Sequence, residues 1–338
     1  MQFWAFLASQ PGPKGRWPDG HSAKLTYLPW QLSRAELKHR FQFESVTLVN
    51  DFAAAANGLA LVGAEHLQTL QTGQPITQAP RLILGAGTGL GVAGMVWDGG
   101  HYKVIPGEGG HLGFSPQTLE QGELWRSLLA KNGRVTTEDI VSGPGLERIY
   151  AFLGGRPEPA EEIGKQALGN SDPLAKKTVE LWLACFGAFA GDLALHWLAQ
   201  GGVYLAGGIA AKLMPYFGPT IFLEAFNAKR EHQHLVEMTP VYLVSEERLG
   251  LLGALALAAT AAWVFAADGR LSASAILGWG FGWSVYEVLL RLPGQRVAII
   301  KGISFNQPAG TCLGIVGPSG SGKTTLLRLM LGIWQAQS

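Results

Sequence analysis

The sequence predicts an α/β fold, and three observations support this. Strand-like and helix-like segments alternate along the N-terminal part of the chain. The turn signal Asp98-Gly99-Gly100 lies between two strand-like segments and predicts a β-hairpin in the middle of the fold. Glycine accounts for 46 of 338 residues, about double the usual share of roughly 7%, which indicates many tight turns and close approaches of the backbone to ligands.

The first elements are expected over residues 1–61. Met1–Leu7 is apolar and aromatic and predicts a strand, and the turn cluster Ser9–Pro13 follows it. The pattern Ser33-Arg34-Ala35-Glu36 fits a capping box, so a short helix should begin there with Leu37 on its apolar face. Ser45–Val49 alternates as a strand that ends at Asn50-Asp51, and the alanine-rich segment Ala53–Leu61 predicts a helix.

The later elements surround two glycine-rich turns. Strands are expected at Leu82–Leu84, Val92–Trp97, His101–Ile105 and Val203–Leu205, and a helix at Thr178–Leu198. The loop Gly85–Gly91 lies between the first two strands, and Gly207-Gly208 follows the last one. The spacing G-x-G-x-x-G at Gly89–Gly94 does not predict a dinucleotide site, because that motif must open a helix and here a strand follows.

Composition excludes several classes of protein. The chain has 26 basic and 25 acidic residues, whereas a dedicated nucleic-acid binder shows a strong basic excess. Two cysteines, Cys185 and Cys312, are too few for a disulfide framework and lack metal-ligand spacing. The N-terminus has no basic region followed by an apolar core, so no secretory signal is expected and the location is predicted to be cytoplasmic.

Asp51 is the candidate catalytic base. A carboxylate at the tip of a strand, directly before a helix, can accept a proton from a substrate hydroxyl. It can also serve as the N-cap of the following helix, and both roles can hold at once.

The two glycine turns are candidate nucleotide-binding sites. In the loop Gly85–Gly91, amides free of bulky side chains at Gly85, Gly87 and Gly89, together with the Thr88 hydroxyl, suit phosphate oxygens. A simple glycine-rich hairpin turn would explain one or two glycines but hardly the four that residues 85–91 contain, Gly91 included. Gly207 and Gly208 would let a base or ribose approach the backbone.

Three polar residues suit a polyhydroxylated ligand. Glu108 and His111 lie three apart in the bend Pro106–His111, and Glu138 lies in Thr136-Thr137-Glu138-Asp139. Together they offer acceptors and a donor for sugar hydroxyls. A metal site is the alternative, but it is disfavoured because no second histidine or cysteine lies near them to complete a set of three or four ligands.

Taken in order, these segments resemble bacterial glucokinase, a hexokinase-type sugar kinase of the actin-like ATPase superfamily. The matching stretches are Leu28–Trp30, Val49–Phe52, Gly85–Gly91, Pro106–His111, Ser142–Leu146, Leu205–Ile209 and Gly250–Gly253. The resemblance covers residues 1–258 and implies a two-lobed, ribonuclease H-like kinase fold.

The resemblance also implies a reaction and a site. Asp51 would deprotonate the 6-hydroxyl of glucose, and Asn50, Glu108, His111 and Glu138 would hold the other hydroxyls. The Gly85–Gly91 loop would bind the phosphates of ATP, with Mg²⁺, and Gly207-Gly208 would lie against adenosine. The resemblance leaves a homodimer open.

One departure from the family concerns the N-terminus. The family opens with a strand that carries Asp-x-Gly-Gly-Thr, and no such motif precedes Asn50. The chain is therefore expected to begin inside the small lobe and to lack its first strands, a phosphate clamp and the acid associated with Mg²⁺. Family membership is better supported than activity.

The last part of the chain has the character of a different protein. Residues 1–260 carry a net charge of −3 and residues 261–338 of +4. Gly317–Thr324 fits the P-loop pattern, in which Gly317, Gly322, Lys323 and Thr324 would bind phosphate and Mg²⁺. Strand-like Cys312–Val316 precedes it and an apolar helix, Thr325–Trp334, follows. Residues 296–338 resemble the start of an ABC exporter nucleotide-binding domain, and a complete ATPase is not expected because no acid follows Glu287.

An apolar connection over residues 259–295 is expected to join the two parts. Leu249–Ala267 is uncharged over 19 residues, about the span of a bilayer core. Eight of the 19 are alanine, which drives insertion weakly, so a membrane location is disfavoured. Leu271–Tyr286 resembles the last membrane hairpin of the same exporters.

The resulting hypothesis is an ATP-dependent glucokinase fused to an exporter fragment. Two alternatives stay open at this point. The chain could be an inert fusion that still binds sugar and nucleotide, or a membrane-associated ABC exporter fragment whose tail defines its role.

Overall fold

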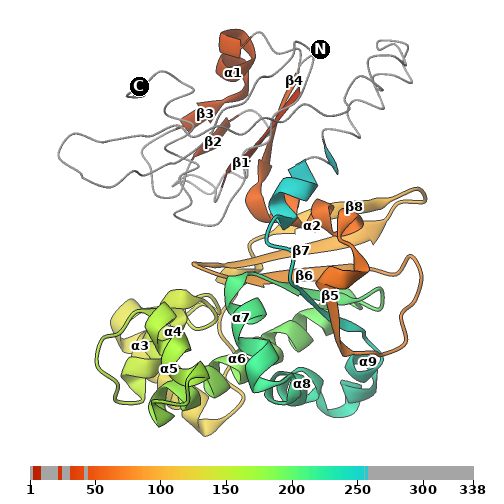
Figure 1. Cartoon of the computed structure of the whole chain (residues 1–338). Coiled ribbons are helices and arrows are strands. Elements are labelled where there is room, and N and C mark those ends of the chain that lie inside the picture. The colour runs from red at the N-terminus through yellow and green to blue at the C-terminus, as the bar shows by residue number, and fades with distance from the viewer. Residues whose placement is uncertain (1–2, 9–21, 25–30, 42–44, 255, 258–338) are drawn as a thin grey trace, which may run out of the picture. The chain divides into compact units, whose positions relative to one another are not determined.

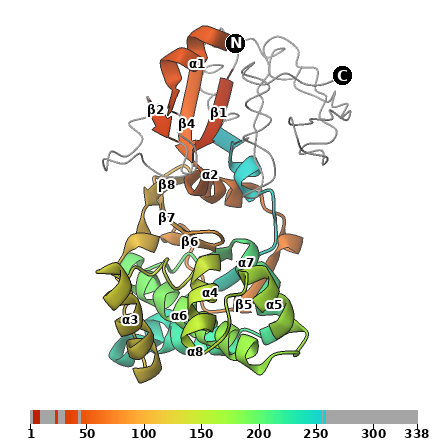
Figure 2. The same ribbon diagram turned by 90° about the vertical axis from the view of Figure 1, so that its left-hand side faces the viewer.

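The computed structural model describes residues 3–8, 22–24, 31–41, 45–254 and 256–257 (Figures 1 and 2). The chain divides into two compact units. Unit 1 comprises Met1–Leu61 and Glu247–Ser338, and unit 2 comprises Val62–Glu246. The turn Ser9–Pro13, the P-loop pattern and the apolar connection lie outside the described residues.

The described residues of unit 1 form two small sheets, two named helices and the helical segment 249–254. Its elements are β1 (Phe3–Ala8), β2 (Ser22–Lys24), β3 (Gln31–Ser33), α1 (Arg34–Phe41), β4 (Ser45–Asn50), α2 (Asp51–Gly58) and η1 (Leu59–Leu61). Strands β1 and β4 pair in parallel, and β2 and β3 pair antiparallel. The capping interaction predicted at Ser33 is present, because its Oγ accepts a hydrogen bond from the Glu36 amide at 3.4 Å. The strand predictions around Met1–Leu7 and Ser45–Val49 are confirmed.

Helix α2 begins two residues earlier than the sequence indicates. Asn50 is its N-cap, since Asn50 Oδ1 accepts hydrogen bonds from the amides of Phe52 at 2.9 Å and Ala53 at 3.0 Å. The helix ends at Gly58 rather than Leu61, where the chain tightens into η1. Its buried alanines allow close packing: a Cβ on Gly253, in the helical segment 249–254, would overlap the Ala54 carbonyl.

Unit 2 is built on a six-stranded mixed sheet. Its strands are β5 (Leu67–Gln71), β6 (Arg81–Ala86), β7 (Leu90–Trp97), β8 (Tyr102–Gly107), β9 (Val203–Ala206) and β10 (Val241–Val244), in the order β5-β10-β9-β6-β7-β8. β6, β7 and β8 form an antiparallel meander, while β6, β9 and β10 are parallel and β5 is antiparallel at the edge. The predicted α/β architecture with a central hairpin is confirmed.

The helices of unit 2 fill the connections between these strands. They are η2 (Ala64–His66), η3 (Gly109–His111), α3 (Leu119–Asn132), α4 (Gly143–Phe152), α5 (Ala160–Leu168), α6 (Pro173–Trp197), α7 (Gly208–Phe217), α8 (Thr220–Asn227), η4 (Arg230–His232) and α9 (Gln233–Glu237). The prediction that the long helix begins at Thr178 is wrong by five residues. Asp172 caps it by accepting a hydrogen bond from the Leu174 amide at 2.8 Å, and Pro173 occupies the first turn.

One face of the sheet carries the main core. Leu82, Leu84, Val203, Leu205, Val241 and Leu243 alternate along β6, β9 and β10 and are all buried in one cluster with residues of α6. Figures 1 and 2 show α6, α7 and α8 on one side of this sheet.

Helix α6 is long and apolar enough to cross a membrane by length and composition, and it is the only such helix in the described part of the chain. In its most apolar stretch, 72% is buried within the structure. This burial is typical of a core helix.

Helices α6 and α8 cross at very short distance. A Cβ placed on Gly187 would overlap the carbonyl oxygen of Phe222, and one on Gly191 would overlap that of Phe226. Only glycine allows the two backbones to approach this closely. The crossing brings Phe186 of α6 edge-on to Phe222 of α8, with ring centroids 5.3 to 5.4 Å apart along the series Trp182–Phe186–Phe222.

The same substitution, glycine to alanine, should have opposite effects on stability at the α6–α8 crossing and at an open position of α3. Gly187→Ala should lower the free energy of unfolding by about 1–3 kcal/mol, because the added methyl overpacks the crossing. Gly122→Ala in α3 should raise it by up to about 1 kcal/mol, since its Cβ meets nothing within 4 Å and alanine is the better helix former. Urea unfolding followed by circular dichroism measures both, and shifts of the same sign would contradict this account.

Candidate active site

Asn50 and Asp51 stand where β4 becomes α2 in unit 1. The Asn50 side-chain carbonyl is occupied by the helix cap, so its amino group is the donor left for a ligand. The Asp51 side chain is exposed, and its Oδ1 accepts a hydrogen bond from the Phe52 amide at 2.8 Å. The N-terminal end of α2 favours a negative charge at this position.

The glycine-rich loop of unit 2 is a tight hairpin turn. Strand β6 continues to Ala86 and β7 resumes at Leu90, with Gly85 paired directly to Gly91. The prediction of an open loop over Gly85–Gly91 is therefore wrong in extent, and only residues 87–89 form the turn. Across it, the Gly87 amide donates to the Gly89 carbonyl at 2.8 Å. A Cβ on Gly87 would meet nothing within 4 Å, so this position faces open space.

Glu108 directly precedes the short helix η3, and His111 is its last residue. The His111 amide donates to the Glu108 carbonyl at 3.0 Å, and His111 Nε2 lies 3.9 Å from Glu108 Oε2. Both side chains are partly exposed, 46% for His111 and 34% for Glu108, so both can reach a ligand. The predicted bend at this position is confirmed.

Glu138 is bonded to the hairpin turn. Its Oε2 accepts a hydrogen bond from the Leu90 amide at 2.8 Å, and its own amide donates to the Gly110 carbonyl at 2.9 Å. A Cβ on Gly89 would lie 2.6 Å from Oε2, so a side chain there would displace the carboxylate. Glu138 thus joins η3 to the β6–β7 turn.

Two helix N-termini lie at the same edge of the sheet as this turn. The Gly143 amide, in the first turn of α4, donates to the Gly87 carbonyl at 2.8 Å. Gly207 caps α7 with φ of +90°, and a Cβ there would overlap the Ala86 carbonyl at the end of β6. Helix N-termini and turn amides present N–H groups that suit anionic oxygens.

Unit 2 therefore brings together most of the predicted site. Glu108, His111, Glu138 and the Gly87–Gly89 turn are connected by the contacts above, and Gly85 and Gly207 are linked to them through β6. Asn50 and Asp51 belong to unit 1. Among the residues that the structure describes, no group of three or more histidine, cysteine, aspartate or glutamate side chains could hold a metal ion.

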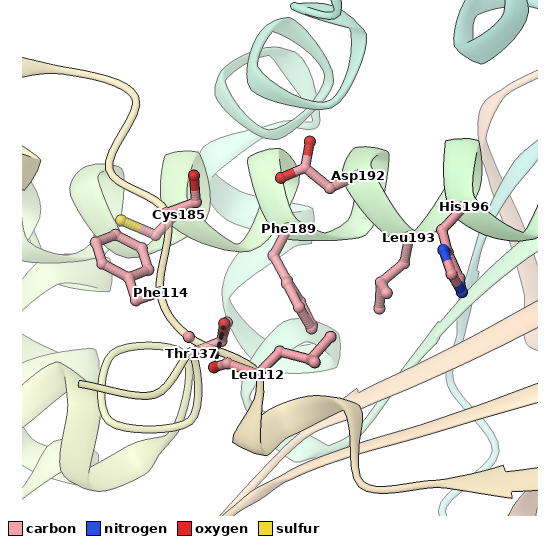
Figure 3. A pocket seen from close by; sticks show the side chains of 10 residues that line it. Leu112, Phe114, Thr137, Cys185, Phe189, Asp192, Leu193 and His196 are labelled. Carbon is pink, nitrogen blue, oxygen red and sulfur yellow. Dashed lines mark hydrogen bonds between the residues drawn. The ribbon is translucent and has the colours of Figure 1, made fainter. Parts of the chain in front are cut away.

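A pocket lies beside this site and is lined by none of its predicted residues (Figure 3). It is a pocket of about 230 Å³ between α6 and the segment that follows His111. Its lining residues are Leu112, Gly113, Phe114, Ser115, Thr137, Cys185, Phe189, Asp192, Leu193 and His196. Burial raises the pKa of the Cys185 thiol to about 12, so this cysteine is an unreactive thiol at neutral pH.

Solved structures define the class of protein. A glucokinase from an Antarctic psychrotroph superposes with a TM-score of 0.66 at 27% identity, covering 75% of this chain and 79% of that one. Glucokinase from Balamuthia mandrillaris has a TM-score of 0.63 at 22% identity and supports the fold alone. With the amide-lined turns described above, the fold is that of the actin-like ATPase sugar kinases, as the resemblance predicted.

The chain belongs to the glucokinase family, whose model matches residues 18–261. It is 38% identical over 244 residues to glucokinase of Saccharophagus degradans, covering 70% of this chain and 76% of that protein. It is 37% identical over 246 residues to glucokinase of Mesorhizobium japonicum, covering 71% and 72%. Its reaction is the ATP-dependent phosphorylation of glucose. Residues 300–338 match the model of the ABC transporter family.

Ser142 and Gly143 are structural parts of the site that were given no role from the sequence. They appear above only within the matching stretch Ser142–Leu146. The signal was present, because a serine directly before Gly-Pro predicts a helix N-cap. In the structure, Ser142 Oγ accepts from the Gly145 amide at 3.0 Å and donates to the Glu138 carbonyl at 2.7 Å.

The two glycines at the start of α7 should respond differently to substitution. Gly207→Ala should lower the free energy of unfolding by about 1–3 kcal/mol, because of its left-handed backbone and the overlap with Ala86. Gly208→Ala should change it by less than about 0.5 kcal/mol, since its Cβ meets nothing within 4 Å. Thermal unfolding without ligand measures both. Equal destabilisation by the two variants would show that the Ala86 contact is unimportant.

Proposed function

We propose that Asp51 is the base that accepts the proton of the 6-hydroxyl of glucose during phosphoryl transfer from ATP. Asn50, Glu108, His111 and Glu138 hold the remaining hydroxyls. Gly85, Gly87, Thr88 and Gly89 of the hairpin bind the phosphates, and Gly207 and Gly208 lie against adenosine. The enzyme works in the cytoplasm.

The position of Asp51 supports its role as base. Its carboxylate is exposed at the start of α2, and the helix N-terminus favours the ionised form, which is the form that accepts a proton. Phosphoryl transfer asks little covalent chemistry of the protein and depends on positioning the alcohol and the phosphate.

The residues that are proposed to bind the sugar offer both hydrogen-bond donors and acceptors. Asn50 supplies a donor, because its carbonyl oxygen is engaged by the cap. Glu138 supplies an acceptor at Oε1, which accepts no hydrogen bond from any described residue, while Oε2 is held by Leu90. Several such partners select a polyhydroxylated acceptor over water, which cannot satisfy them all.

The turns fit a nucleotide. Added Cβ atoms at Gly87 and Gly208 would meet nothing within 4 Å, so both positions leave room for a ligand at the backbone. Amides of the hairpin turn and of the α7 N-terminus can donate to phosphate oxygens. The amides of the first turn of α4 are already bonded to Gly87 and Ser142. When bound with ATP, Mg²⁺ supplies neutralisation of charge on the transferred phosphoryl group. No cluster of carboxylates in the described ranges would hold the ion without the nucleotide.

The single observation that carries this proposal is the hydrogen bond from the Leu90 amide to Glu138. Through this bond Glu138, which is proposed to bind sugar, contacts the end of the turn that is proposed to bind phosphate. A sugar kinase needs its two substrates side by side, and this contact joins their proposed sites within one unit.

Replacement of the base tests the proposal. Asp51→Asn should lower kcat by about 10²–10⁴-fold, because the amide keeps the shape of the side chain but cannot accept the proton. KM for glucose should change little. A coupled assay for glucose 6-phosphate on the full chain measures both constants.

The matched control is Asp98→Asn, in the turn between β7 and β8. Asp98 Oδ1 accepts from the amides of Gly100 and His101, and asparagine can do the same. This variant should retain full activity. If Asp51→Asn is as active as Asp98→Asn, Asp51 is not the base.

A further inference from the structure

The two ends of the hairpin turn are held by one short segment of chain. At one end, the Leu90 amide donates to Glu138 Oε2 at 2.8 Å. At the other end, the Gly87 carbonyl accepts from the Gly143 amide at 2.8 Å. The segment 138–143 therefore spans the turn and contacts it on both sides.

The Ser142 hydroxyl closes this segment on itself. Ser142 is 1% exposed, and its Oγ donates to the Glu138 carbonyl at 2.7 Å while accepting from the Gly145 amide at 3.0 Å. One hydroxyl thus connects the residue that is proposed to bind sugar to the N-terminus of α4. The bond to the Gly145 amide is buried and the bond to the Glu138 carbonyl is partly buried, which favours a rigid connection.

We propose that Ser142 is a positioning residue that couples the two substrates, so that sugar bound at Glu138 strengthens nucleotide binding at the hairpin. This inference rests on the proposed function and adds a role that the proposed site residues do not have. A sugar hydroxyl at Oε1 fixes the Glu138 carboxylate, and Oε2 then fixes the Leu90 amide. Through Ser142, the backbone carbonyl of Glu138, the residue that carries this carboxylate, is fixed relative to Gly143, which holds Gly87.

The coupling is reciprocal by thermodynamic necessity. A nucleotide that orders residues 87–90 also fixes the bond from the Leu90 amide to Glu138 and the bond from the Gly143 amide to Gly87. It must therefore strengthen sugar binding by the same factor. Ser142 touches neither substrate in this scheme. Its removal should therefore reduce the coupling between the two sites more than the affinity of either site alone.

The segment has a second anchor, so a variant at Ser142 should fold. Arg148 Nη1 donates to the Asp139 carbonyl at 2.8 Å, and Asp139 Oδ2 accepts from the Thr136 amide at 2.9 Å. These contacts keep residues 136–139 against α4 without the serine. They do not replace the link between Glu138 and the cap of α4.

The experiment measures glucose affinity by calorimetry on the full chain, with and without a non-hydrolysable ATP analogue and Mg²⁺. In the wild type, the analogue should strengthen glucose binding by at least about 5-fold, the lower end of typical coupling factors. In Ser142→Ala this factor should fall below about 2-fold, while glucose affinity without nucleotide changes less. Ser142→Thr keeps the hydroxyl and should restore the coupling.

Thr118→Ala is the matched control for loss of a helix cap. Thr118 Oγ1 caps α3 by accepting from the Gln121 amide at 3.2 Å and contacts none of the proposed site residues. It should keep the wild-type coupling factor. If Thr118→Ala and Ser142→Ala lose coupling equally, the effect is general destabilisation and the proposal is wrong.

A second pair of variants tests the other end of the turn. Gly143→Pro removes the amide that donates to Gly87 and should also abolish the coupling. Gly143→Ala keeps the amide, and its Cβ would lie 3.5 Å from the Gly87 carbonyl, an ordinary contact distance, so coupling should persist. Coupling that survives in both Ser142→Ala and Gly143→Pro overturns the proposal. Failure of the proposed function is distinguishable, because Asp51→Asn would then be as active as Asp98→Asn, whatever the coupling factor.

Discussion

The hydrogen bond between Glu138 and the Leu90 amide is the constraint on which the site depends. It uses one oxygen of an ionisable side chain as part of the scaffold and leaves the other for a ligand. Charged acceptors make stronger hydrogen bonds than neutral ones. The contact also requires glycine at position 89, since a side chain there would meet the carboxylate. Glu138 therefore holds the end of the turn at Leu90 and restricts position 89 to glycine.

The sheet holds the rest of the site around this contact. Strand β6 lies between β7 and β9, and its apolar residues are buried on both faces, with Leu82, Ile83 and Leu84 all at 0% exposure. The turns that follow β6 and β9 grow from adjacent parallel strands, with Gly85 paired to Ala206. Because the interior is close-packed, the positions of these two turns relative to each other are set by the core.

The sequence predicted the alternation of elements and the cap at Ser33, but the caps of α2 and α6 and the convergence of the site came from the structure. Local pattern located the strands, yet α2 and α6 begin earlier than expected because the side chains of Asn50 and Asp172 accept hydrogen bonds from the first turns. The length of the glycine loop was overestimated, because Gly85 and Gly91 pair between β6 and β7 and such cross-strand pairing cannot be read from the local sequence. Glu138 lies 48 residues from Leu90, and no local rule predicts their contact.

The proposed site residues are divided between the two units, which concerns how the enzyme selects a sugar over water. The proposed base belongs to unit 1, whereas Glu108, His111, Glu138 and the phosphate-facing turn belong to unit 2. Asn50, the other residue proposed to bind a hydroxyl, also belongs to unit 1, so each unit carries part of the proposed recognition of hydroxyls. An acceptor such as water can approach a base but cannot occupy the partners of several hydroxyls. Within unit 2 alone, Glu108, His111 and Glu138 offer hydrogen-bond partners to a ligand that carries several hydroxyls, which is the chemistry of a hexose.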